Sequence, residues 1–269
     1  MSAATLDPGQ EPDLQDLLIL CYHAVSPEWR SFLAVDPEQL RRQVDLLLGR
    51  GYAPMTLSDA LASPGGRRLV VTFDDGYRSI LARGLPVLAG LGVPATAFVQ
   101  TDLADAAGRF AALPEEELPD DPAELECMSW EEVRELAATG WEIGSHTRTH
   151  PHLEQIPAAA AAEELQASRQ RCEEELQAPC RTIAYPFGTY DRGVMELTEQ
   201  AGYEAAVTLE SRLLEPISGR TRFDLPREGV FNETGRAKFL ANTSRLVRRV
   251  RLAPAYARVA RGPLASSHR

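Results

Sequence analysis

Two adjacent carboxylates and two spaced histidines are the residues of this chain best suited to chemistry. Asp74 and Asp75 follow an apolar run and precede Gly76, which lets the chain turn out of a strand. Adjacent carboxylates repel, and a metal ion or a cationic neighbour would make the repulsion tolerable. His146 and His150 lie four residues apart, a spacing that on a helical turn lets two imidazoles bind one divalent ion. A solvated turn and two surface or capping histidines are the alternative interpretations.

The segments around these residues resemble motifs of the polysaccharide deacetylases, which are metal-dependent carbohydrate esterases with a NodB-type domain. In chain order the matching segments are Thr72-Phe73-Asp74-Asp75-Gly76, Ser145-His146-Thr147-Arg148-Thr149-His150 and Ala184-Tyr185-Pro186-Phe187-Gly188. The resemblance extends over about residues 18–230. It implies a single α/β domain with a distorted or incomplete (β/α) barrel. It also implies hydrolytic removal of N-acetyl groups from an N-acetylated amino sugar or glycan precursor.

The resemblance also implies roles for individual residues. Asp75, His146 and His150 are expected to bind a divalent metal, with zinc as the expected ion. Asp74 is expected to be the general base that takes a proton from the attacking water. Two rival functions remain at this point: an amidohydrolase that acts on a cyclic amide or ureide, and a catalytically silent carbohydrate-binding domain.

The third motif is expected to form part of the substrate pocket. By resemblance, the backbone N–H of Phe187 donates to the developing oxyanion and its ring walls the pocket. Tyr185 and Pro186 are assigned to the same substrate-binding turn. An ordinary core aromatic is the alternative for Phe187.

The general acid is not where many members of the family have it, because a late Leu-Xaa-Xaa-His motif is missing and His268 lies in the tail. The pair Tyr22-His23 instead resembles the branch that includes poly-N-acetylglucosamine deacetylases, in which an N-terminal histidine does this work. His23 is therefore the candidate acid. A histidine with a structural hydrogen bond at a strand end is the alternative.

The arginine that often opens the third motif and orients the base is replaced by Ala184. We expect Arg227, beside the end of a late strand, to supply the guanidinium and to pair with Asp74, which would keep that carboxylate ionised. Arg181 is the rival candidate, and a surface arginine is the alternative for both.

Composition is that of an ordinary soluble protein, with 44% hydrophobic and 25% charged residues. The four cysteines form no Cys-Xaa-Xaa-Cys pair, which favours reduced thiols over a disulfide framework. The first 16 residues are acidic and lack the basic start of a secretory signal. These features predict a cytoplasmic protein with a flexible leader over residues 1–16.

Charge is unevenly distributed between the body and the C-terminal segment. Residues 236–269 carry nine Lys or Arg and no Asp or Glu, whereas the rest of the chain has 19 basic and 39 acidic groups. This basic tail is predicted to be amphipathic and to make peripheral contact with an anionic membrane surface. A helix packed on the acidic body, or disorder, is the alternative. The acidic body argues against nucleic acid as a partner.

Strands and helices are predicted to alternate, which implies a parallel sheet within a catalytic domain over residues 17–235. Strands are expected at residues 17–22, 69–73, 95–99, 141–144, 182–185, 205–209 and 230–231. Helices are expected to start at Asp36-Pro37, after Gly76, at the Ser129 capping box, at residue 158 and at residue 191. Residues 101–128 are acidic and contain three prolines, and are expected to form a long loop over the strand ends.

Overall fold

Seven parallel strands close into a barrel in the computed structural model, which describes residues 16–63, 65–111, 113–209 and 222–244. The ring runs β1-β10-β9-β8-β7-β6-β5 and closes because β1 also pairs with β5. The predicted fold class is therefore confirmed. Residues 1–15 of the predicted leader and residues 245–269 of the basic tail lie outside the described residues.

The strands of the ring are short, and their sequences are mostly apolar. They are β1 (Leu17–Tyr22), β5 (Arg68–Phe73), β6 (Thr96–Val99), β7 (Glu142–Ser145), β8 (Thr182–Ala184), β9 (Ala205–Leu209) and β10 (Leu225–Gly229). A short strand, β4 (Ala53–Pro54), adds to β5, and β2 (Ala24–Val25) pairs with β3 (Ala34–Val35) outside the barrel.

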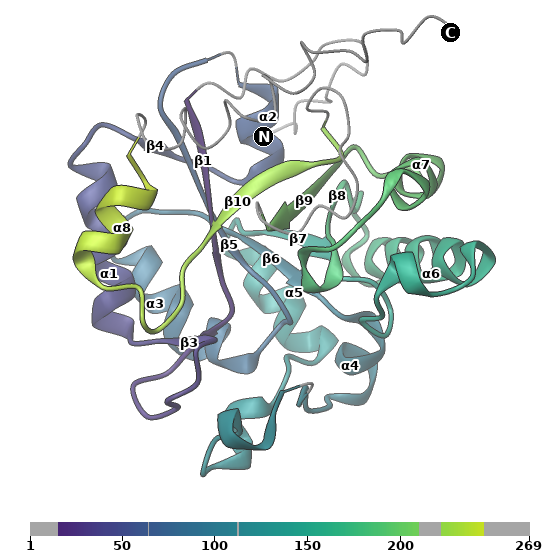
Figure 1. The fold of residues 1–269 in the computed structure, drawn as a ribbon, viewed down its shortest axis with the longest axis horizontal. Helices are drawn as coiled ribbons and strands as arrows, with labels where there is room; N and C mark the ends of the chain where they lie inside the picture. The colour runs from purple at the N-terminus through teal and green to yellow at the C-terminus, as the bar shows by residue number, and fades with distance from the viewer. Residues whose placement is uncertain (1–15, 64, 112, 210–221, 245–269) are drawn as a thin grey trace, which may run out of the picture.

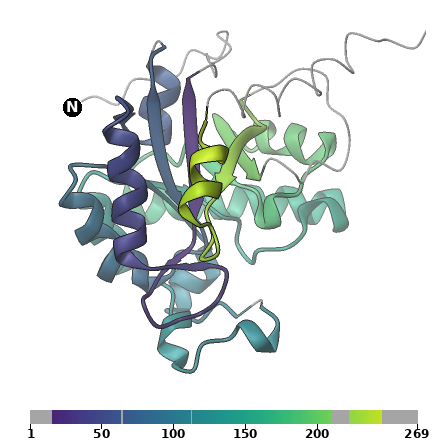
Figure 2. The ribbon, with the colours of Figure 1, turned by 60° about the vertical axis from the view of Figure 1, so that its left-hand side comes forward.

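Helices surround the barrel, as Figure 1 shows. They are α1 (Pro37–Leu48), α2 (Leu57–Ala62), a π-helix (Ile80–Gly84) that runs into α3 (Leu85–Ala89), α4 (Thr101–Ala106), α5 (Trp130–Ala138), α6 (Ala158–Leu176), α7 (Arg192–Gln200) and α8 (Arg236–Asn242). Figures 1 and 2 both place α8 next to α1. None of the helices in the described part of the chain has the length and apolar run needed to cross a bilayer.

Helix starts follow the local signals in the sequence. The Asp36 side chain accepts hydrogen bonds from the backbone N–H groups of the first turn of α1, with Pro37 at the first helical position. Ser129 and Glu132 form a reciprocal capping box at the start of α5. These two predicted starts are confirmed because capping depends on residues close together in sequence.

The predicted position of the last strand was wrong. The strand, β10, is Leu225–Gly229 and not residues 230–231. Its middle residues, Pro226, Arg227 and Glu228, are not typical strand formers. Arg227 is nevertheless 2% exposed, because it points into the barrel and meets an acidic partner there. Tertiary pairing has therefore overridden local propensity in β10.

Two apolar cores hold the barrel. The larger core packs between the strands and the outer helices. The smaller core fills the barrel interior with side chains from alternate strand positions, such as Leu17 and Ile19 of β1, and includes Leu57 and Ala60 of α2. Because α2 packs with the first residues of β1, it closes the amino end of the barrel. Polar side chains gather at the carboxyl ends, where barrel enzymes have their active sites.

Candidate functional site

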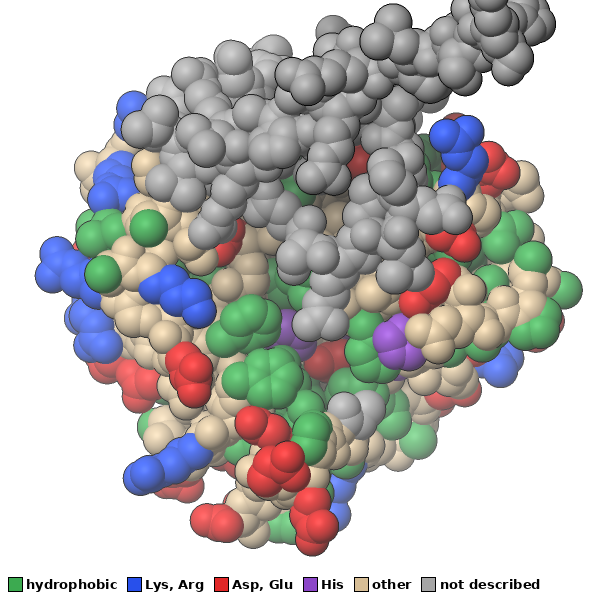
Figure 3. Space-filling model, viewed as in Figure 1, with side chains coloured by type: hydrophobic (Ala, Val, Ile, Leu, Met, Phe, Trp, Pro, Cys, Tyr) green, Lys and Arg blue, Asp and Glu red, His purple; other side chains and the backbone are tan. Residues whose placement is uncertain are grey.

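The predicted site residues come together at the carboxyl ends of the strands. Asp74 and Asp75 follow β5, His146 and His150 follow β7, and His23 follows β1. All of them except His23 are at least nine-tenths buried. Figure 3 shows histidine and acidic side chains in a hollow bordered by hydrophobic side chains on this face.

Asp75, His146 and His150 form a cluster with the spacing of a metal site. Each offers one ligand atom, and the three atoms lie within 4.8 Å of one another. Each histidine has its Nε2 atom 3.5 Å from Asp75 Oδ1. An ion bound about 2.0–2.2 Å from nitrogen and oxygen donors fits between atoms at this separation.

The two histidines are on an irregular loop, so the predicted helical turn is wrong. Thr147 and His150 have positive φ values of 65° and 62°, in the left-handed region that non-glycine residues rarely adopt. The loop is stabilised by hydrogen bonds instead: His150 N–H donates to Thr147 Oγ1 at 3.0 Å. The imidazoles still meet, with ring centroids 4.7 Å apart.

A buried carboxylate on α6 also stabilises the histidine loop. Glu164 accepts hydrogen bonds from the backbone N–H groups of Arg148 and Thr149, each at 2.9 Å, and from Thr149 Oγ1 at 2.7 Å. The Thr149 side chain is thus anchored to α6. Its acceptor, Glu164, was not predicted, because nothing in a long Ala- and Glu-rich helix marks which carboxylate faces inward.

Both histidines are held in the neutral form. His146 Nδ1–H donates to the Ala184 carbonyl at 2.8 Å, which leaves Nε2 without a proton on the side of Asp75. Burial lowers the pKa of His146. Burial, together with the proximity of His146, lowers the pKa of His150 to about 2. Neutral imidazole is the form that binds a metal.

Asp75 is in an environment that disfavours its charge unless a cation is present. Burial and the adjacent Asp74 raise the pKa of Asp75 well above its usual value. Gln100, which follows β6, donates from Nε2 to Asp75 Oδ1 at 3.2 Å and compensates only in part. A divalent ion would supply the missing positive charge, so the donor set fits such an ion.

Asp74 is paired with Arg227 through both carboxylate oxygens. Arg227 Nη1 lies 2.6 Å from Asp74 Oδ1, and Nη2 lies 2.6 Å from Oδ2. The same guanidinium donates to Thr72 Oγ1 at 3.0 Å. Burial alone would raise the pKa of Asp74, but the Arg227 guanidinium holds it well below its usual value. The expected Arg227–Asp74 contact is thus present, whereas the rival Arg181 pairs with Glu204.

His23 lies beside this pair. One ring nitrogen of His23, an Asp74 oxygen and the Cys21 sulfur are all within 4.8 Å of one another. Burial lowers the pKa of His23 to about 4. The His23 ring also stacks on Phe231, with centroids 6.3 Å apart. The predicted acid is therefore close to the predicted base.

The third motif places one aromatic ring at the site. Phe187 has a φ of 58°, and its ring meets His150 with centroids 4.5 Å apart. The ring of His152, to which no catalytic or binding role was assigned from the sequence, stacks on the Phe187 ring with centroids 3.8 Å apart. Pro186 opens the short turn that carries Phe187.

Tyr185 needs a correction, because its side chain belongs to the core. It is fully buried, its hydroxyl donates to the Phe223 carbonyl at 3.1 Å, and its ring stacks on Tyr190. These contacts turn the ring away from the site, since alternate residues of an extended segment face opposite sides.

The acidic segment 101–128 is folded against the site rather than a bare loop. It contains α4 and two short 3₁₀ turns, Glu115–Glu117 and Pro122–Leu125. The Phe110 ring within it meets His150 edge-on, with centroids 4.8 Å apart. Phe110 was missed because a single aromatic in an irregular acidic stretch carries no positional signal.

Solved deacetylase structures share this fold. A Streptococcus pyogenes deacetylase, PplD, in complex with acetate superposes with a TM-score of 0.68 and 23% sequence identity, covering 85% of this chain and 98% of that one. IcaB from Ammonifex degensii gives a TM-score of 0.65 at 23% identity, covering 87% and 98%.

Curated relatives are similar in sequence as well. YxkH of Bacillus subtilis, which carries the name of a polysaccharide deacetylase, is 26% identical over 200 residues, or 72% of this chain. The poly-β-1,6-N-acetyl-D-glucosamine N-deacetylase of Staphylococcus aureus strain MRSA252 is 25% identical over 161 residues, or 56% of this chain. The chain spans 64% and 51% of these relatives, less than two thirds of either. The polysaccharide deacetylase family model matches residues 62–206, more than half of the 269 residues, and the chain therefore belongs to the polysaccharide deacetylase family.

Proposed function

We propose that this protein is a metal-dependent N-deacetylase that acts on an N-acetylated amino sugar or glycan precursor. The observation that carries the proposal is the joint arrangement of Asp75, His146 and His150 beside the buried Asp74–Arg227 pair. The Staphylococcus aureus relative, named for deacetylation of poly-β-1,6-N-acetyl-D-glucosamine, supports an amino-sugar substrate.

Asp75, His146 and His150 would hold the metal. A divalent ion there supplies Lewis acidity, which polarises the amide carbonyl and makes a water easier to deprotonate. Zinc suits two imidazoles and one carboxylate. The neutral state of both histidines and the unbalanced charge environment of Asp75 support this assignment.

Asp74 acts as the general base. Its carboxylate remains ionised because Arg227 binds both oxygens, and it accepts the proton that the attacking water loses. Arg227 is a positioning residue, since its bidentate contact fixes the plane of the carboxylate. Thr72 of β5 bonds the guanidinium and restricts it further.

His23 and Phe187 complete the reaction. His23 lies close enough to Asp74 for a proton to reach it and then the departing amine. The backbone N–H of Phe187 donates to the carbonyl oxygen as negative charge develops there. The Phe187 ring, which packs against His150 and His152, forms an apolar wall that suits the methyl group of an acetyl.

Metal analysis combined with acetate release tests the function. The purified chain is assayed on β-1,4- and β-1,6-linked N-acetylglucosamine oligomers, on lipid-linked N-acetylated sugars, and on a cyclic amide and a ureide. We expect about one divalent ion per chain and acetate release from at least one sugar. Hydrolysis of the cyclic amide or ureide alone would favour the rival amidohydrolase. Bound oligomer without metal or turnover would favour a silent binding domain.

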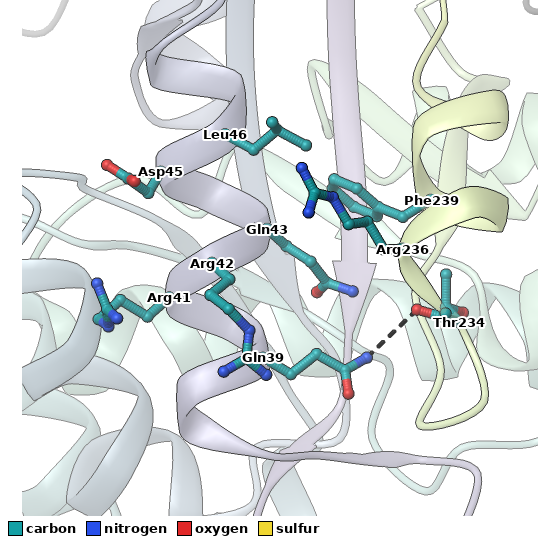
Figure 4. Close-up of a pocket in the computed structure, with 10 residues that line it drawn as sticks. Gln39, Arg41, Arg42, Gln43, Asp45, Leu46, Thr234, Arg236 and Phe239 are labelled. Carbon is teal, nitrogen blue, oxygen red and sulfur yellow. Dashed lines mark hydrogen bonds between the residues drawn. The ribbon is translucent and has the colours of Figure 1, made fainter.

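We further propose that the protein makes peripheral contact with anionic lipid headgroups near its basic tail. A cavity of about 430 Å³ lies between α1 and α8, the first element of that tail. Figure 4 shows Arg236 and Phe239 of α8 extending toward Gln43 and Leu46 of α1. Arg42, which also lines the cavity, and Arg236 have no carboxylate partner within the described residues. A phosphate headgroup is an anion that such arginines bind well.

Vesicle flotation of the full chain tests this contact. We expect binding to phosphatidylglycerol vesicles that weakens with salt, and little binding to phosphatidylcholine. Replacing Arg42 and Arg236 together by alanine is expected to reduce the bound fraction several-fold. The exposed Arg192 of α7 serves as the control for loss of one surface charge. If the wild-type chain ignores anionic vesicles, the proposal is wrong.

A further inference from the structure

Strand β1 brings a second pair of metal-binding side chains to the base. Residues at alternate positions of a strand face the same side, and Ile19 of β1 faces the barrel interior. Cys21 and His23 follow at this spacing. The Cys21 thiol is fully buried and donates to Asp74 Oδ2 at 3.4 Å. Register agrees with this placement, because Tyr22 pairs with Phe73, one residue before Asp74.

The three groups have the composition of a site for a thiophilic metal. A sulfur, an imidazole nitrogen and a carboxylate oxygen lie within 4.8 Å of one another. The Nδ1 atom of His23 is buried and has no hydrogen-bond partner among the described residues. Thiolate and imidazole together select Zn²⁺ or Cd²⁺ over Mg²⁺ and Ca²⁺. We propose that Cys21, His23 and Asp74 form a second metal site whose occupation by excess Zn²⁺ or Cd²⁺ inhibits the enzyme.

The distance between sulfur and oxygen suits a bridging ion. Zinc binds sulfur at about 2.3 Å and carboxylate oxygen at about 2.0–2.2 Å. With those two bond lengths and the observed 3.4 Å between Cys21 Sγ and Asp74 Oδ2, the angle at the ion is roughly 98–104°, near the tetrahedral value. The His23 ring nitrogen, which lies within 4.8 Å of both atoms, would be the third ligand.

Binding replaces a proton without any redox step. The S–H bond of Cys21 breaks, its proton goes to solvent, and the sulfur lone pair forms the metal–sulfur bond. The lone pair of Asp74 Oδ2 that accepted the thiol hydrogen becomes available to the ion. Arg227 can keep its two contacts with Asp74, since each carboxylate oxygen has two acceptor positions.

Electrostatics make this second site weaker than the first. The Arg227 guanidinium is adjacent, and an ion at Asp75 would add positive charge nearby. The second ion therefore binds only when metal is in excess. Once bound, it occupies the base Asp74 and the acid His23 together. The inhibitory part of the proposal rests on the proposed function, whereas metal binding itself does not.

A cadmium titration of the metal-free full chain tests the site without an activity assay. Cadmium–thiolate bonds give an ultraviolet charge-transfer band, whereas cadmium bound to histidine and carboxylate does not. We expect two equivalents to bind, with the band growing during the second. Cys21→Ser keeps a hydroxyl donor for Asp74 but is expected to lose the band. Cys127→Ser is the matched control, because Cys127 is a buried thiol 3.5 Å from the Asp75 carbonyl oxygen without a histidine ligand set.

Zinc dependence of acetate release tests the inhibition. We expect the wild-type rate to fall at least about tenfold from one equivalent of zinc to a large excess, because both proton-transfer groups are occupied. Cys127→Ser should show the same fall, and Cys21→Ser less than about a twofold fall. Equal inhibition of Cys21→Ser and wild type would overturn the inhibitory role.

Two further results separate the parts of the proposal. If Cys21→Ser does not fold, His23→Gln is titrated instead, and an unweakened thiolate band in that variant overturns the three-ligand site. Absence of a thiolate band in the wild type overturns the site itself, whatever the activity. A clear band in a chain that releases no acetate leaves the site standing and refutes the proposed function alone.

Discussion

As the proposed general base, Asp74 has to satisfy two opposing demands. A base must be ionised before it can accept a proton, and the double contact with Arg227 ensures this in a buried position. The same contact lowers the pKa of Asp74 and so weakens it as a base. A weakly basic carboxylate gives up its proton readily, and His23 lies close enough to receive it. The pair is thus suited to passing a proton on rather than to storing it.

Replacing Asp74 by asparagine should separate proton transfer from metal binding. The asparagine side chain keeps the shape of the aspartate and one acceptor for Arg227, but it cannot take a proton. We expect Asp74→Asn to retain about one metal ion per chain and to lose at least about 100-fold in turnover. Metal analysis and acetate release on the same preparation measure both. Turnover within about tenfold of wild type would show that another group is the base.

Replacing Arg227 should affect stability and rate together. Arg227→Met leaves the Asp74 charge buried without a partner, which is expected to lower the free energy of unfolding by about 3–5 kcal/mol. Denaturant unfolding measures this change. The double variant with Asp74→Asn should recover much of the loss, because no charge is then left unpaired. An unchanged rate in Arg227→Met would refute the role of Arg227 as the orienting residue.

Replacing His23 should lower turnover most for substrates whose amine is a poor leaving group. We expect His23→Ala to lower turnover of N-acetylglucosamine substrates by about 10²–10⁴-fold. An acetanilide with an electron-withdrawing ring releases its amine with less help, so its rate should fall much less. Comparing the two substrates on one preparation removes differences in folding or metal content. Near-normal turnover of the sugar would assign His23 a structural role.

Strands and helices were predicted correctly from the sequence where local signals determine them. The apolar strands β1 and β5 and the capped helices α1 and α5 were found because their patterns and caps lie within a few residues. The strand β10 was misplaced because its central arginine is stabilised by a carboxylate 153 positions away. Such a partner is not visible in a local window.

The backbone of the site was also beyond prediction from sequence. Asp75, Thr147, His150 and Phe187 all have positive φ values between 58° and 67°. Each such residue costs on the order of 1–3 kcal/mol, which the surrounding contacts must offset. Residue types and motifs therefore identified the candidate ligands, but the helical turn expected for the histidines was wrong because tertiary contacts hold them in a strained loop.

The contact between Glu164 of α6 and the histidine loop can be tested directly by mutation. It connects α6 to the histidine loop through three hydrogen bonds, while the neighbouring Glu163 is more exposed. We expect Glu164→Ala to weaken metal affinity by about 10–100-fold with helix content unchanged. Isothermal titration with Zn²⁺ and circular dichroism measure the two quantities. Glu163→Ala is the matched control, and equal affinities in the two variants would contradict the assignment.

The closed barrel is what brings distant parts of the chain to one point. Its ring places β5 and β7 on either side of β6, so residues after the two outer strands can meet above the middle one. A metal held by Asp75, His146 and His150 would cross-link β5 to β7 at the carboxyl end. Metal binding should therefore stabilise the fold as a whole and not only the site.

We expect divalent metal to raise the thermal unfolding midpoint. At a free ion concentration about 100 times Kd, the gain is about 2.7 kcal/mol, or roughly 5–11 °C for a domain of this size. Differential scanning calorimetry with Zn²⁺ and with EDTA measures the difference. Asp75→Asn should show almost no metal-dependent shift in the unfolding midpoint. The substitution removes the only charged member of the proposed ligand set, which lies 3.5 Å from both histidines.

The same variant should behave in the opposite way when metal is absent. The folded-state pKa of Asp75 is raised, so the unfolded chain binds fewer protons than the folded one above the unfolded-state pKa of about 3.9. The metal-free wild type must then lose stability as pH rises from that value, whereas Asp75→Asn lacks this loss. At neutral pH in EDTA, Asp75→Asn should therefore unfold at the higher temperature. A lower midpoint for the variant would mean that Asp75 is stabilised as an anion by groups other than a bound cation.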